Sequence, residues 1–171
     1  LSHSPQSIST PTPAMKNHPI LHRLFVICLL LLGMNTFAAP SVNTLKNSFF
    51  ASQTDTAING YDSVAYFTQN APVKGQDAHT YEWKGAKWKF ATAANLDLFR
   101  NNPDKYAPQY GGYCAYGVAK DGLVKVDPDQ FTIFEGKLYL NYDASVQKEW
   151  AKDRAGYIRQ ADAKFPQLLA K

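Results

Sequence analysis

The chain has 171 residues, of which 45% are apolar and 19% charged, and its formal net charge is +4. This composition is typical of a folded globular protein and excludes disordered and collagen-like chains. No cluster of four or more Lys and Arg residues occurs after residue 38. We therefore expect that the protein binds neither nucleic acid nor an anionic membrane surface.

The first 38 residues have the pattern of a leader with a cleavable signal peptide. A basic stretch that contains Lys16 and Arg23 precedes an apolar run from Leu24 to Met34. This run is shorter than the roughly 20 residues that a membrane span needs, and it is typical of a secretory signal. Small residues favour cleavage after Ala38. We therefore expect a periplasmic or secreted domain of residues 39–171 without a membrane span.

The first elements expected after the leader are a helix and a strand. Apolar residues at spacings of three and four predict a short amphipathic helix that begins at Ser41 and contains Val42, Leu45, Phe49 and Phe50. Asn59-Gly60 is a turn signal, and the apolar run 64–67 after it predicts a short buried strand.

Two β-hairpins are the clearest local signals. Alternating apolar and polar residues over 80–90 and 131–140 predict antiparallel pairs that turn at Lys84-Gly85 and Glu135-Gly136. Between the hairpins, Thr92 is placed to cap a helix that the Asn102-Pro103 step ends.

A long C-terminal helix is expected from Asp143 onward. Its apolar stripe must cover another element and consists of Val146, Trp150, Tyr157, Ala161 and Phe165. Hairpins with one apolar face, combined with helices that need a partner, predict the α+β class. We expect a single domain in which a small antiparallel β-sheet built from hairpins is covered by helices, including the C-terminal one.

Five ordered motifs together resemble the YHS domain family, and specifically its exported single-domain members. The motifs are 60–67, the hairpin 81–90, 99–106, 110–115 and 138–142, within a resemblance that covers about residues 55–169. Metal-associated members of this family carry Phe-Cys-Ser-x-x-Cys at the end of the first hairpin. This chain reads Phe90-Ala-Thr-Ala-Ala-Asn95 there, so the resemblance implies no metal ligand at Ala91 or Asn95.

Cys114 is the only thiol after residue 38, because Cys28 lies in the leader. It is preceded by Tyr110, two glycines and Tyr113. A functional interpretation makes it a metal ligand, a redox thiol or a thiol beside an oxidisable phenol. The alternative is a buried small apolar residue, since free cysteine is among the most buried residue types.

His79 and Asp62 are the other candidate site residues. His79 precedes the first hairpin and serves either as a ligand or acid/base group, or as a solvated loop residue. Asp62 follows the Asn-Gly turn, where it either accepts backbone hydrogen bonds or orients a tyrosine or histidine. A metal site normally needs three or four protein ligands, so Cys114 and His79 alone would not complete one.

Three hypotheses follow. The first is a binding module that holds a small ligand or a transition metal, such as copper, in a pocket near Cys114 with His79, Asp62, Tyr113 and Tyr110. The second is a redox enzyme that uses Cys114 and tyrosine chemistry, and the third is a non-catalytic protein-interaction domain. The chain has no nucleotide-binding glycine loop and no motif of a hydrolase, which favours a binding protein over an enzyme. We expect a monomer or a weak homodimer.

Overall fold

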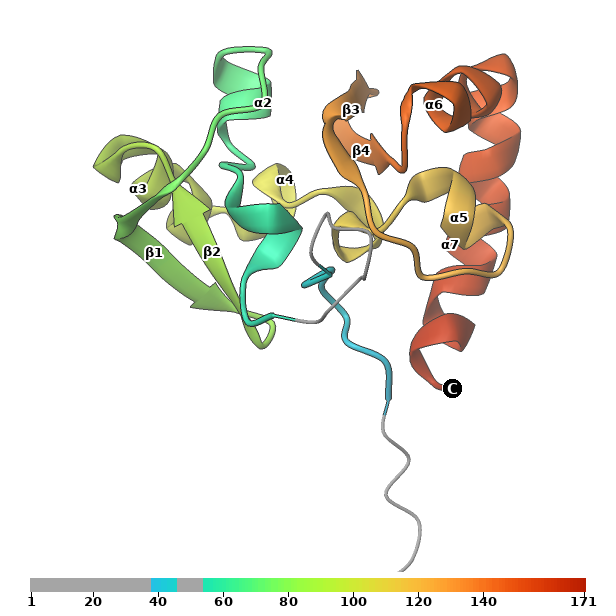
Figure 1. The fold of residues 1–171 in the computed structure, drawn as a ribbon, viewed down its shortest axis with the longest axis horizontal. Helices are drawn as coiled ribbons and strands as arrows, with labels where there is room; N and C mark the ends of the chain where they lie inside the picture. The colour runs from blue at the N-terminus through green and yellow to red at the C-terminus, as the bar shows by residue number, and fades with distance from the viewer. Residues whose placement is uncertain (1–37, 46–53) are drawn as a thin grey trace, which may run out of the picture. The chain divides into compact units, whose positions relative to one another are not determined.

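The computed structural model of the chain describes residues 38–45 and 54–171, which belong to one compact unit. The helices and strands of this unit confirm the predicted α+β class (Figure 1). In chain order they are η1 (Ala57–Gly60), α2 (Ala65–Thr68), β1 (Gln76–Trp83), β2 (Ala86–Phe90), α3 (Ala93–Asn101), α4 (Pro103–Tyr106), η2 (Gln109–Gly112), α5 (Ala115–Ala119), β3 (Asp127–Phe134), β4 (Lys137–Asn141), α6 (Ala144–Trp150), η3 (Ala151–Asp153) and α7 (Arg154–Leu169).

Both predicted hairpins are confirmed. β1 pairs with β2 and β3 pairs with β4, and each antiparallel pair forms its own two-stranded sheet. The turn residues Lys84-Gly85 and Glu135-Gly136 all have positive φ. Two positive φ angles in a row are what a type I′ turn needs, and this turn matches the twist of the strands that it joins.

Side-chain caps set the helix boundaries. Thr92 Oγ1 accepts a hydrogen bond from the Asn95 amide at the start of α3, as the sequence predicts. Asn102 ends α3 and also caps α4, which begins at Pro103. The long C-terminal helical segment is confirmed and consists of α6 and α7, because Asp153 interrupts it and caps α7.

Two of the local predictions are wrong. The predicted strand 64–67 is the helix α2, because Asp62 Oδ1 accepts hydrogen bonds from the Val64 and Ala65 amides and thereby caps a helical turn. Residues 41–45 are not helical, since the Asn43 amide and side chain bind the carbonyls of Gly111 and Gly112. The rest of that predicted helix lies outside the described residues.

The buried residues form two clusters. In one cluster, Phe99 of α3 packs on Trp88 and Phe90 of β2, with ring centroids 5.0 Å from it in both cases. In the other, Trp150 of α6 packs on Tyr139 of β4. Figure 1 shows the β1–β2 hairpin and α3 on one side of the unit and α5, α6 and α7 on the other. Within 38–45 and 54–171, no helix is long and apolar enough to cross a membrane.

Candidate functional site

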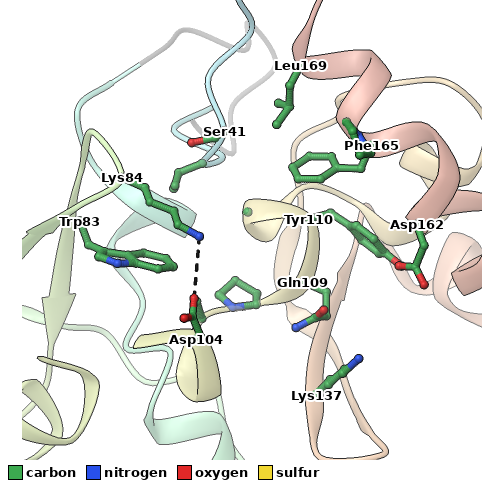
Figure 2. Close-up of a pocket in the computed structure, with 15 residues that line it drawn as sticks. Ser41, Trp83, Lys84, Asp104, Gln109, Tyr110, Lys137, Asp162, Phe165 and Leu169 are labelled. Carbon is green, nitrogen blue, oxygen red and sulfur yellow. Dashed lines mark hydrogen bonds and ion pairs between the residues drawn. The ribbon is translucent and has the colours of Figure 1, made fainter. Parts of the chain in front are cut away.

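A pocket of about 790 Å³ lies between the β1–β2 hairpin and α7 (Figure 2). Small-molecule sites usually have volumes of about 300–1,000 Å³, so the pocket has the size of a ligand site. It is lined by Ser41, Val42, Trp83, Lys84, Asp104, Ala107, Pro108, Gln109, Tyr110, Gly111, Lys137, Asp162, Phe165, Pro166 and Leu169.

Aromatic side chains line two sides of this pocket. Trp83, the last residue of β1, lies on one side, and Tyr110 and Phe165 lie on the other (Figure 2). The rings of Tyr110 and Phe165 meet edge to face, with centroids 5.7 Å apart. Such walls suit the flat or apolar body of an organic ligand.

Most charged groups of the pocket have partners within it. Lys84 Nζ lies 3.8 Å from Asp104 Oδ1, and the Tyr110 hydroxyl donates a 2.9 Å hydrogen bond to Asp162 Oδ1. Burial, followed by the bond to Asp162, raises the pKa of Tyr110. The phenol therefore keeps its proton at neutral pH and acts as a donor.

Residues 38–45 form one wall of the pocket, where Ser41 and Val42 contribute to the lining. The Ala39 amide donates to the Leu169 carbonyl at the end of α7, and the Tyr113 hydroxyl donates to the Pro40 carbonyl. Gly111 has a φ of +62°, and a Cβ atom there would lie 1.9 Å from the Ser41 carbonyl oxygen. This close approach requires glycine at position 111.

The five site residues predicted from the sequence occupy different environments. Tyr110 lines the pocket, and Tyr113 holds the segment 38–45. Cys114, Asp62 and His79 are not among the lining residues.

Cys114 is buried, with 1% of its surface exposed, and it caps α5. Its sulfur accepts a hydrogen bond from the Gly117 amide at 3.3 Å and lies 3.7 Å from Asn141 Oδ1. Burial raises the pKa of the thiol. The thiolate is the form that binds metals and attacks electrophiles, so this environment disfavours both activities.

Asp62 is fully buried and accepts four hydrogen bonds. Two come from the start of α2, and the other two reach Oδ2 from the Ala91 amide at 2.8 Å and the Asn95 side chain at 2.7 Å. Ala91 and Asn95 are the positions where the resemblance places cysteines in metal-associated members. In this chain the residues at both positions donate hydrogen bonds to the Asp62 carboxylate instead.

His79 lies in β1, half-buried and away from Cys114, since β1 and α5 are on opposite sides of the unit (Figure 1). Among the residues that the structure describes, no group of three or more His, Cys, Asp and Glu side chains is placed to hold a metal ion. The residues present therefore do not fit a metal site of ordinary composition. A ligand role for His79 stays a prediction.

Most of the pocket was not predictable from the sequence. Of its lining residues, Trp83, Gln109 and Lys137 were not among the predicted site residues. The lining residues come from the N-terminal segment, a hairpin turn, α4 and the chain after it, β4 and α7. No local pattern marks residues that only the tertiary fold brings together.

Comparison with known proteins finds one family. Residues 64–110 match the family model described as YHS domain, and this range extends from the start of α2 to Tyr110 in the pocket wall. No curated protein and no solved structure matches the chain.

Proposed function

Because residues 64–110 match the YHS domain family, we propose that the chain is an exported binding module that holds a small organic ligand between the β1–β2 hairpin and α7. The pocket of about 790 Å³, with aromatic side chains on two sides and polar groups between them, is the observation that carries this proposal. The signal-peptide pattern of residues 1–38 supports export.

A transition metal held by Cys114 and His79 has less support than an organic ligand. The two residues lie on separate elements, and burial raises the pKa of the thiol. The same burial weighs against a redox enzyme based on Cys114. An interaction domain would need an apolar docking face, whereas the exposed large apolar side chains of the described part are Leu98 and Tyr142, on different elements.

Ligand binding is tested by calorimetric titration of the purified protein, expressed with residues 1–38 so that processing can occur. The probes are naphthalene derivatives, whose flat apolar body suits a pocket with aromatic side chains on two sides. We expect 1:1 binding of at least one probe, weakened by Phe165→Ala and unchanged by the control Leu98→Ala, a substitution outside the pocket lining. Absence of binding by every probe, or equal binding by Phe165→Ala, would contradict the proposal.

Two further measurements on the same preparation test export and the metal. The intact mass of protein recovered from the exported fraction should correspond to residues 39–171. Elemental analysis should find less than one transition metal ion per chain, and Cys114→Ser should leave that content unchanged. A stoichiometric metal that Cys114→Ser removes would favour the metal site over the organic ligand.

A further inference from the structure

One wall of the pocket is a segment that can separate from the rest of the domain. We propose that residues 39–45 form a strap that closes over a bound ligand, and that Tyr113 is the positioning residue that holds this strap in place. This inference rests on the proposed function, because the strap is a wall of the same pocket. A ligand is fully enclosed only while the strap is seated.

The first step is the overlap between the pocket and the contacts of the strap. Ser41 and Val42 of the strap line the pocket, and Figure 2 shows Ser41 at the same end of it as Leu169. Leu169 and Gly111 also line the pocket, and their backbone carbonyls accept hydrogen bonds from strap amides. A ligand at this end therefore touches both the strap and the residues that hold it.

The second step is the way in which the strap is attached. It belongs to no helix or strand of the described part of the chain. The Asn43 amide donates to the Gly111 carbonyl at 2.9 Å, and the Asn43 side chain donates to the Gly112 carbonyl at 2.8 Å. Segments attached by single hydrogen bonds outside helices and sheets open locally while the rest of a domain stays folded.

The third step is the position of Tyr113. Its hydroxyl donates to the Pro40 carbonyl at 3.1 Å and lies 3.5 Å from the Val42 carbonyl. Burial raises the pKa of this phenol, so the hydroxyl keeps its proton at neutral pH and remains a donor. Tyr113 is 3% exposed and does not line the pocket. It therefore acts on a ligand through the strap.

The fourth step is the thermodynamic coupling between the strap and the ligand. A ligand that contacts Ser41 and Val42 binds the seated state more tightly than the open state. Binding must then hold the strap closed, because the two equilibria are linked and their coupling is reciprocal. If the open state does not bind, the open fraction falls by a factor of one plus the ligand concentration divided by its dissociation constant.

The test is hydrogen exchange of the Asn43 amide, which bonds to Gly111 only while the strap is seated. Exchange is followed by NMR at pH 7 in the purified protein, expressed with residues 1–38. Naphthalene-2-carboxylate and naphthalene-2-carboxamide are the probes, and each one that binds is added at ten times its dissociation constant. We expect the exchange of this amide to slow about tenfold.

Tyr113→Phe removes only the hydroxyl that holds the strap. Without a ligand, this variant should speed the exchange of the Asn43 amide about fivefold, the effect of one hydrogen bond. The matched control is Tyr66→Phe, because the buried Tyr66 hydroxyl donates to the Pro128 carbonyl at 3.0 Å and Tyr66 does not line the pocket. It should leave the exchange of the Asn43 amide unchanged.

The outcomes separate the strap from the pocket. If a probe binds in calorimetry and the exchange of the Asn43 amide does not slow, the strap is no part of the binding equilibrium and the inference is wrong, while the ligand pocket stands. Equal acceleration by Tyr113→Phe and Tyr66→Phe would also overturn it, since the segment would then open only when the whole domain unfolds. Failure of both probes to bind would contradict the ligand pocket, and with it the strap.

Discussion

Asn95 donates a 2.7 Å hydrogen bond from its side-chain amide to Asp62 Oδ2, and both side chains are buried. This contact ties the start of α3 to the loop before α2. Its position is notable because the family resemblance places a cysteine where this chain has Asn95. In this chain, Asn95 and Asp62 therefore stabilise the fold through a buried hydrogen bond.

Asn95→Ala should destabilise the protein by about 1.5–3 kcal/mol, because the buried carboxylate of Asp62 would lose one of its four donors. Urea unfolding followed by circular dichroism measures this difference. Asn101→Ala is the control, since Asn101 is exposed on the same helix and alanine is a better helix former. Equal stability of the two variants would mean that the Asp62 contact has no net effect.

The contacts of Asp62 illustrate which parts of the fold could be predicted from the sequence and which could not. The hairpins were predictable because their turns and alternation are local, and the caps at Thr92 and Asp143 are local as well. The helical conformation of residues 64–67 was not predictable. It depends on the Asp62 carboxylate, whose position is also fixed by hydrogen bonds from Ala91 and Asn95, far away in the sequence. The pocket needs Trp83 and Phe165 together, and only the tertiary fold brings them to one place.

Trp150→Ala should cost about 3–5 kcal/mol, as deletions of large buried aromatic side chains do. Trp150 is fully buried, and its ring packs on Tyr139 with centroids 5.3 Å apart. The control Tyr142→Ala removes an aromatic side chain that is 40% exposed, and it should cost much less. A near-zero loss in the Trp150 variant, measured by chemical denaturation, would mean that α6 is peripheral to the core.

Gly111→Ala should destabilise the protein more than Gly136→Ala does. Both glycines have positive φ, which costs alanine about 1–2 kcal/mol, but only at Gly111 does the added Cβ meet the Ser41 carbonyl. The excess over the Gly136 variant measures how tightly residues 38–45 are seated. Limited proteolysis should also cut this segment faster in the Gly111 variant. Equal losses and equal cleavage would show that the segment tolerates displacement.

The thiol of Cys114 should make stability fall as pH rises above 9.0, its ordinary pKa. Burial raises the pKa in the folded state, so above pH 9.0 the unfolded chain releases a proton that the folded chain keeps. The slope approaches about 1.4 kcal/mol per pH unit until the folded pKa is reached. Between pH 9 and 10, Cys114→Ala should show a shallower decline in urea unfolding. An unchanged slope would mean that the thiol is solvated in the folded protein.

The location of the ligand site is tested most directly by nitrogen–proton correlation NMR during titration with naphthalene-2-carboxylate. The chain has three tryptophans, whose indole N–H groups give separate signals. We predict that the Trp83 indole and the Gly111 amide shift most, because both residues line the pocket, while the buried Trp150 indole keeps its position. Shifts centred on Cys114 and Gly117, with Trp83 unmoved, would contradict a ligand site between the hairpin and α7.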